Sequence, residues 1–180
     1  MIGVLALQGN FDSHVKILEK INLNHRLIKN TEDLNLLDGL ILPGGESTTI
    51  TNLLRKHKNM IDGINLLASK KPILGSCAGL ILMSKDSNDD RVHNFGFLDI
   101  STNRNAYGRQ VHSFEAKINV KYKKINSNIN SLFIRAPKVN RVDKHVEVLA
   151  TFNNEIVAVS YTHLRAHETS LHLVCRLLLE

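Results

Sequence analysis

The chain has 180 residues, of which 43% are hydrophobic and 22% charged; these values are typical of one soluble globular domain and exclude a disordered or collagen-like chain. The 23 Lys and Arg residues outnumber the 17 Asp and Glu residues and leave a formal charge of +6, but they are scattered and aromatic residues make up only 5%, which favours a solvated basic surface, or a patch for an acidic partner, over nucleic-acid binding. No apolar run approaches the ~20 residues that span a bilayer, and the first residues lack the basic and long apolar regions of a signal peptide, so we expect a cytoplasmic protein.

Short apolar runs alternate with helical patterns in the first half of the chain. The runs predict strands at Ile2–Leu7, His25–Ile28, Gly39–Leu42 and Ile73–Leu74. Apolar residues at helical spacing predict helices at Asp12–Ile21, Thr48–Lys56 and Met60–Ser69. This alternation predicts an α/β fold, a doubly wound and mostly parallel sheet with helices on both faces. Functional residues of such a fold lie just after the carboxyl ends of the strands, here after Leu7, Leu42 and Leu74.

The second half predicts shorter strands that either extend this sheet or form an antiparallel edge. They are expected at Glu115–Val120, Leu132–Ile134, Val146–Thr151 and Glu155–Ser160. The segment Lys121–Asn130 is rich in Lys, Asn and Ser and predicts a surface loop.

Cys77 stands at the centre of Gly75-Ser76-Cys77-Ala78-Gly79, between a predicted strand and the helical run Leu80–Lys85. This is the strand–nucleophile–helix elbow with Cys in place of Ser, in which small neighbours allow a tight turn that lifts the side chain clear of the backbone. A helix N-terminus and a nearby base lower a thiol pKa, so we predict a nucleophile. The alternative is a small buried hydrophobe in a turn closed by glycines. Cys175 lies far along the chain, which argues against a disulfide framework, and we assign it no role.

A second glycine turn, Pro43-Gly44-Gly45-Glu46-Ser47-Thr48-Thr49, follows the strand at Gly39–Leu42. Two glycines let backbone N–H groups converge on a bound oxygen, which predicts an oxyanion hole if this turn meets the cysteine elbow at one sheet edge. A helix cap by Ser47 or Thr48 is expected as well.

Two segments place arginine beside small or turn-forming residues, Asn103–Gln110 with Arg104 and Phe133–Pro137 with Arg135. Arginine pairs bidentately with a carboxylate, which suits a substrate with an α-carboxyl group. Spacing alone favours surface arginines.

Five strings together resemble one family: GVLALQG at Gly3–Gly9, LDGLILPGGESTT at Leu37–Thr49, GSCAGLILM at Gly75–Met83, RNAYGRQVHSFEA at Arg104–Ala116 and FIRAP at Phe133–Pro137. They are similar to the glutaminase subunit of pyridoxal 5'-phosphate synthase, within the flavodoxin-like class I glutamine amidotransferases. The match runs in order from residue 2 to about residue 159, which predicts a glutaminase domain at residues 1–159. His112 departs from the family, which usually carries an acidic residue there.

The resemblance implies hydrolysis of L-glutamine to L-glutamate and ammonia, with Cys77 forming a glutamyl thioester that water cleaves. It implies that glutamine contacts Gly45, Glu46, Ser47, Arg104 and the pair Ile134 and Arg135, and that loop amides stabilise the oxyanion. It also implies a partner, the synthase subunit, which receives the ammonia, builds the pyridoxal ring of vitamin B6 and orders the oxyanion loop on docking. No metal or organic cofactor is implied for this step.

The tail breaks the resemblance. A cysteine nucleophile needs a histidine base and an orienting acid, which the family supplies in a C-terminal His-Pro-Glu string. That string is absent, and counting along the family pattern puts its His near Ser170 and its Glu near His172. His163, His167 and Glu168 also lie in the tail, but the adjacent pair His167 and Glu168 points to opposite faces of a strand, and the strand that delivers the string is expected to be missing.

We therefore predict that residues 160–180 are an atypical tail of cloning or adapter sequence and not native family sequence; a genuine divergent C-terminus is the alternative. Two functions compete with a working glutaminase. One is a catalytically impaired glutamine-binding subunit that docks on the synthase. The other is a cysteine peptidase or hydrolase of similar plan, against which the PGGEST and arginine strings count.

Overall fold

The structure is a computed structural model that describes residues 1–103, 114–133, 137–165 and 168–175, with side chains through residue 162 except that of Phe114. In the first half, strands and helices alternate as predicted. The elements in chain order are β1 (Ile2–Leu5), α1 (Phe11–Lys20), β2 (His25–Ile28), the 3-10 turn η1 (Thr31–Leu34), β3 (Gly39–Leu42), α2 (Ser47–Lys56), α3 (Met60–Ala68), β4 (Ile73–Ser76) and α4 (Ala78–Met83). In the described part of the chain, no helix is both long and apolar enough to cross a membrane.

The second half consists of short strands. They are β5 (Ser84–Asp86), β6 (Leu98–Asn103), β7 (Phe114–Tyr122), β8 (Ile125–Phe133), β9 (Lys138–Val142), β10 (Glu147–Phe152), β11 (Glu155–Arg165) and β12 (Glu168–Cys175). The sequence patterns did not predict η1, β5, β6 and β9. Strands β5, β6 and β9 form a separate small sheet, whereas β10 and β11 extend the main sheet at one edge.

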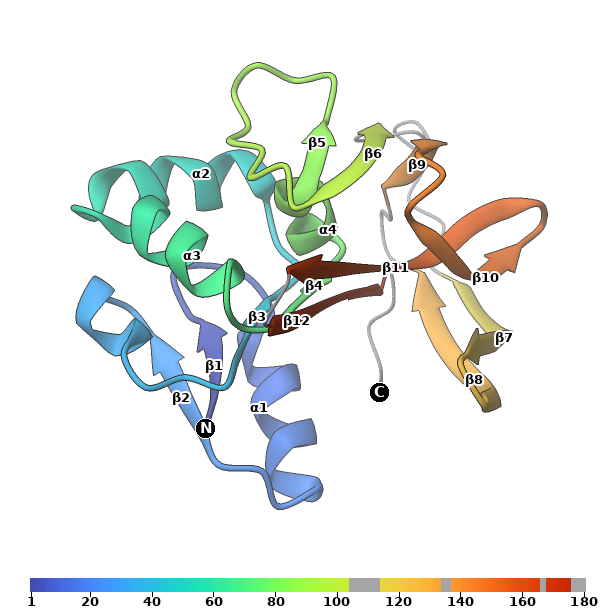
Figure 1. Ribbon diagram of the computed structural model, residues 1–180, viewed down its shortest axis with the longest axis horizontal. Coiled ribbons are helices and arrows are strands. Elements are labelled where there is room, and N and C mark those ends of the chain that lie inside the picture. The colour runs from blue at the N-terminus through green and yellow to red at the C-terminus, as the bar shows by residue number, and fades with distance from the viewer. Residues whose placement is uncertain (104–113, 134–136, 166–167, 176–180) are drawn as a thin grey trace.

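The main sheet has seven strands in the order β10-β11-β12-β4-β3-β1-β2. The five strands from β12 to β2 run parallel to one another. Strand β11 runs antiparallel to both of its neighbours, β12 and β10. Helix α1 covers one face and α2 and α3 cover the other (Figure 1). This confirms the predicted α/β class, a mostly parallel sheet with helices on both faces.

Strand β3 shows why both faces are covered, because all four of its residues are buried. Ile41 packs with Val4 and Leu18 on the face covered by α1. Leu40 and Leu42 point to the opposite face, since successive side chains of a strand alternate, and join the core formed with α2, α3 and α4. Burial on both faces explains the uninterrupted apolar run in the sequence.

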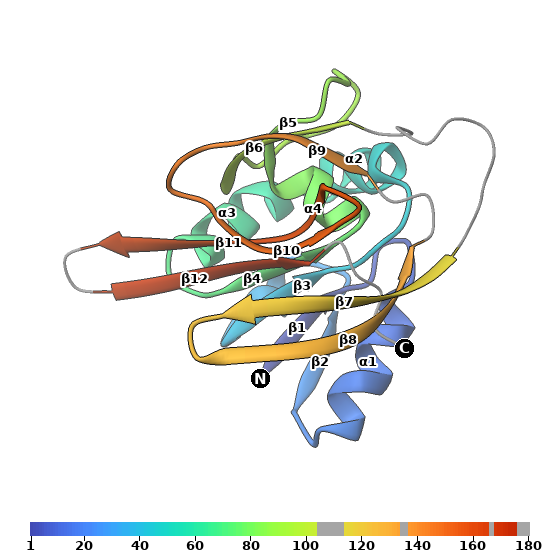
Figure 2. The ribbon, with the colours of Figure 1, turned by 90° about the vertical axis from the view of Figure 1, so that its right-hand side faces the viewer.

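The predicted loop at Lys121–Asn130 is wrong, because most of it belongs to a β-hairpin. Strands β7 and β8 pair from Phe114 with Phe133 to Tyr122 with Ile125, and only Lys123 and Lys124 form the turn. The hairpin forms the lower strand pair in the foreground of Figure 2 and packs through Ile118 and Phe133 against β10 and β11. Polar residues conceal the alternation of apolar and polar side chains in β8. Ser131 is buried on the inward face, between Ile129 and Phe133 on the same face.

The tail adds a strand to the main sheet, which the sequence patterns did not predict. Strand β12 lies inside the main sheet, with Cys175 opposite Ser76 of β4 and Val174 opposite Val159 of β11. Its sequence, ETSLHLVC, alternates Leu with polar residues, which is typical of a strand. The domain limits, 1–159 followed by an atypical tail at 160–180, stay a prediction.

Candidate active site

Cys77 lies at the junction between β4 and α4, as the elbow motif predicts. Its backbone has φ 47° and ψ −102°, a conformation that L-residues adopt only at a cost. The side chain is half-buried. A strained residue at a strand–helix junction is the conformation by which the elbow presents a nucleophile.

Gly79 makes this tight turn possible. A Cβ atom at Gly79 would lie 2.0 Å from the backbone oxygen of Leu42, so a larger residue would push α4 away from β3. The carbonyl oxygen of Cys77 accepts a hydrogen bond of 3.2 Å from the N–H of Ile81, which starts α4 directly at the elbow. The spacing of the motif therefore reflects close packing of helix against strand.

The Gly44–Gly45 loop meets the elbow, as the sheet topology predicted. A Cβ atom at Gly44 would lie 3.4 Å from the Cβ atom of Cys77. The carbonyl oxygen of Gly44 accepts a hydrogen bond of 2.9 Å from the N–H of Asn10. The side-chain Oε1 of Gln8 accepts one of 3.0 Å from the N–H of Glu46. The loop after β1 thus fixes the glycine loop after β3 beside Cys77.

The start of α2 carries polar side chains next to this loop. Glu46 is the N-cap residue and Ser47 the first helical residue, and neither Ser47 nor Thr48 caps the helix, so that expectation is wrong. The hydroxyl of Thr48 donates a hydrogen bond of 3.1 Å to Oε1 of Glu46. The hydroxyl of Ser47 is buried and has no hydrogen-bond partner among the described residues. A buried polar atom without a partner is costly, which makes Ser47 a candidate ligand contact.

Two residues beside the elbow, His14 and Gln8, were not predicted from the sequence. His14 lies on α1, and its Nε2 is 3.0 Å from the Oγ of Ser76, the residue before Cys77. Burial lowers the pKa of His14, so the ring is neutral at neutral pH. Nothing in the sequence around a helical histidine indicates a contact with a serine 62 residues away. Gln8 could have been predicted, because it directly follows a strand, where functional residues were expected.

Several predicted residues lie outside the described part of the chain. These are Arg104, Ile134 and Arg135 of the expected glutamine pocket, together with His112 and His167. Within the described ranges, no group of three or more His, Cys, Asp or Glu residues could hold a metal ion.

The backbone register places His163 and His172 away from Cys77. His172 pairs with Ile73, at the amino end of β4, whereas Cys77 follows the carboxyl end of that strand. Four residues of strand separate the two levels by about 13 Å. His163 pairs with Ser170, farther still along the β11–β12 ribbon. Cys175 is level with Ser76, the residue before Cys77. That the family's histidine falls near Ser170 stays a prediction.

The chain is similar to proteins of one family. The model of the SNO glutamine amidotransferase family matches residues 4–173. The pyridoxal 5'-phosphate synthase subunit PdxT of Oenococcus oeni is 44% identical, over 87% of this chain and 81% of the relative. The protein of the same name from Thermosipho africanus is 40% identical, over 96% of this chain and 98% of the relative.

Solved structures show the same likeness. The crystal structure of a glutamine amidotransferase matches with a TM-score of 0.84 and 33% identity, over 98% of this chain and 89% of that chain. PurLQS from Thermotoga maritima matches with a TM-score of 0.67 over 96% of this chain and 84% of that chain; at 15% identity it shows the fold alone. The strained Cys77 beside a double-glycine loop and the fold are consistent with these matches. The family model and the relatives show that the chain belongs to the SNO glutamine amidotransferase family.

Proposed function

We propose that this protein is the glutaminase subunit of a pyridoxal 5'-phosphate synthase, which hydrolyses L-glutamine to L-glutamate and ammonia and passes the ammonia to a synthase subunit. The observation that carries the proposal is Cys77, held at φ 47° between β4 and α4 with the Gly44–Gly45 loop against it. The names of the PdxT relatives support the choice of pathway, since they are subunits of that synthase.

The reaction proceeds by covalent catalysis. The thiolate of Cys77 attacks the side-chain carboxamide carbon of glutamine, and the C=O electron pair moves to oxygen. The tetrahedral intermediate collapses, the C–N bond breaks and, once nitrogen takes up a proton, ammonia leaves. Water then attacks the thioester carbon, glutamate leaves and the thiol returns. Backbone N–H groups of the Gly44–Gly45 loop and of Ala78, the residue after the nucleophile, stabilise the oxyanion.

Glutamine is bound by residues on both sides of the elbow. Gly45, Glu46 and Ser47 line one side, and the buried hydroxyl of Ser47 offers a hydrogen bond that no described protein group takes. Arg104, Ile134 and Arg135 complete the pocket by the family resemblance, with arginine pairing with the α-carboxylate.

Proton transfer is the step that this chain supports least. The thiol must lose a proton and the leaving amine must gain one, which is the work of a histidine. The backbone register keeps His172 about 13 Å along the sheet from Cys77, from four residues of strand rise. A second candidate function follows from this register: a catalytically impaired glutamine-binding subunit that still docks on the synthase.

One experiment separates the two functions. Because Cys175 is level with Ser76, the residue before Cys77, a His-Pro-Glu string is introduced directly after Cys175. We would compare the unchanged chain, Cys77→Ala, and the triple variant Arg176→His, Leu177→Pro, Leu178→Glu, each mixed with a synthase subunit, and measure glutamate release from L-glutamine. The matched control keeps Leu177→Pro and Leu178→Glu but has Arg176→Gln.

Release only in the triple variant supports the glutaminase family function and an impaired unchanged chain. Release in the unchanged chain that Cys77→Ala abolishes means that a tail histidine already acts as base. No release from any of the proteins, each shown to be folded, contradicts the glutaminase proposal. Release that is faster with the synthase than without it supports activation by docking.

A further inference from the structure

His14 is a buried imidazole to which neither the fold nor the proposed reaction gives a task. It lies on α1 with 8% of its surface exposed, and Ser76 is 1% exposed. The two residues are 62 positions apart in sequence, yet Nε2 of His14 lies 3.0 Å from Oγ of Ser76. A solitary imidazole is expensive to bury, so a hydrogen bond to one particular hydroxyl sets the place of the ring.

Ser76 links this histidine to both catalytic loops. It directly precedes Cys77, whose φ of 47° sets the elbow. It also lies against the glycine loop, since a Cβ atom at Gly44 would be 3.9 Å from Oγ of Ser76 and 3.4 Å from the Cβ atom of Cys77. The hydroxyl therefore lies in contact range of both His14 and the glycine loop.

Helix α1 makes a second connection to the same place. The N–H of Asn10, directly before α1, donates a hydrogen bond of 2.9 Å to the carbonyl oxygen of Gly44. One helix thus holds the elbow through His14 and the glycine loop through Asn10. Strained backbone persists only where its surroundings hold it in place, and these two contacts supply that support.

We propose that His14 is a positioning residue for Cys77: its hydrogen bond to Ser76 holds the elbow in the strained conformation that presents the thiol to glutamine. This inference rests on the proposed glutaminase function. His14 does not touch the reacting atoms, and its effect passes through Ser76. Without the bond, the backbone at Ser76 and Cys77 relaxes toward an ordinary φ, which turns the thiol away from the glycine loop.

The test compares four full-length proteins: the unchanged chain, His14→Leu, His14→Gln and Ser76→Ala. Leu removes the hydrogen bond and keeps the volume, whereas the Gln amide reaches about as far as Nε2 and keeps the bond. Two reagents report on Cys77: iodoacetamide measures its general reactivity, and azaserine, an electrophilic glutamine analogue, measures its reactivity in the glutamine pocket. Mass spectrometry identifies the labelled residue, and circular dichroism measures the folded fraction.

We expect His14→Leu and Ser76→Ala each to slow both labelling reactions by roughly ten- to hundredfold per folded molecule, the size of effect that a misplaced reacting group produces. His14→Gln restores the rate to within about threefold of the unchanged chain, because it retains the bond that a merely structural role would not require. The double variant His14→Leu, Ser76→Ala is no slower than the slower single variant, since both remove one interaction.

Rates within about twofold of the unchanged chain in folded His14→Leu and Ser76→Ala overturn the proposal, since this difference is below 0.5 kcal/mol at about 1.4 kcal/mol per tenfold. Equal losses in His14→Gln and His14→Leu overturn it as well. If His14→Leu fails to fold, Ser76→Ala decides, because it removes a single oxygen atom. An unchanged chain that reacts with iodoacetamide but not with azaserine contradicts a working glutaminase site, while the iodoacetamide rates still decide the role of His14.

Discussion

Cys77 differs from the other residues that have a positive φ in the described part of the chain. Most of them are asparagines such as Asn22, Asn59 and Asn88, and asparagine tolerates the left-handed region in turns. Cys77 has no such tolerance, and its ψ of −102° lies outside that region altogether. The strain at Cys77 therefore lies at the site, at a residue most of whose neighbours on β4 and α4 are buried.

A buried histidine, His14, and a half-buried one, His93, make stability depend on pH. Burial lowers the pKa of His14, and burial followed by the charge of Arg55 lowers the pKa of His93. The unfolded chain then binds protons more readily than the folded one. The stability from the two neutral rings is fully present above the ordinary value of 6.5 and is lost as the pH falls from there toward the folded-state pKa values.

Urea unfolding at about pH 7.5 and about pH 5.5 tests this dependence. We expect a lower free energy of unfolding at the lower pH and a smaller difference between the two values in His14→Gln, which removes one buried imidazole. His145→Gln, which removes an exposed imidazole, is the control. An equal difference in the unchanged chain and in His14→Gln would contradict the prediction.

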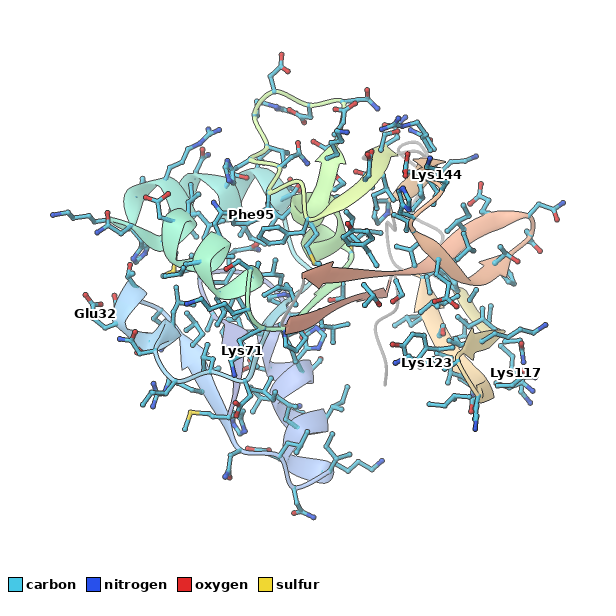
Figure 3. All side chains as sticks on the ribbon, in the orientation of Figure 1. Glu32, Lys71, Phe95, Lys117, Lys123 and Lys144 are labelled. Atoms are coloured by element: carbon cyan, nitrogen blue, oxygen red, sulfur yellow. The ribbon has the colours of Figure 1, made fainter. Side chains whose placement is uncertain are left out.

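Among the elements, the β7–β8 hairpin shows how a polar segment forms regular structure. Its outward positions carry charged or amide side chains, among them Lys117, and its inward positions pack on β10 and β11. Lys117 and Lys123 project from the hairpin into solvent (Figure 3). The register depends on a two-residue turn in which Lys123 has φ 51°.

We expect Lys123→Gly to stabilise the hairpin by about 1 kcal/mol, because glycine adopts a positive φ without the steric cost that lysine has. Amide hydrogen exchange at Tyr122 and Ile125, which flank the turn, measures this as slower exchange. Lys124→Gly removes the same charge at a position that lacks a positive φ, so we expect faster exchange there. Slower exchange in both variants would mean that charge repulsion, not backbone strain, limits the turn.

At the scale of the whole molecule, one strand joins the two halves of the main sheet. Strand β12 pairs with β4 on one side and with β11 on the other, so it connects the parallel strands to the β10–β11 edge. Without it, β4 and β11 would each expose an unpaired edge, and open edges promote association between chains.

Deletion of residues 166–180 should therefore lower the thermal midpoint and produce soluble oligomers or aggregate, because it removes β12 and leaves β11 complete. Differential scanning fluorimetry and light scattering measure the two effects. Deletion of residues 176–180 alone retains β12 and is the matched control. A monomer with an unchanged midpoint after the longer deletion would show that β12 does not pair in solution.

Local patterns predicted the first half of the fold and the centre of the site. The four strands from β1 to β4 and their helices follow from apolar periodicity, since buried elements carry it along their whole length. Cys77 and the Gly44–Gly45 loop could be predicted because the elbow and the glycine turn are contiguous motifs. The resemblance of five sequence strings to a known family predicted the family and the synthase named for the relatives. The periodicity of apolar residues alone carries no such information.

Tertiary structure decided what depends on contacts between distant segments. The hairpin at Lys121–Asn130 forms because each strand supplies the other's backbone hydrogen bonds, and a single segment carries no record of its partner. The contact of His14 with Ser76 joins a helix to a strand end across 62 residues. The insertion of β12 between β11 and β4 sets the level of residues 168–175 relative to Cys77. Sequence by itself determined the periodicity and chemistry of each segment; pairing, register and proximity arose only when the segments packed together.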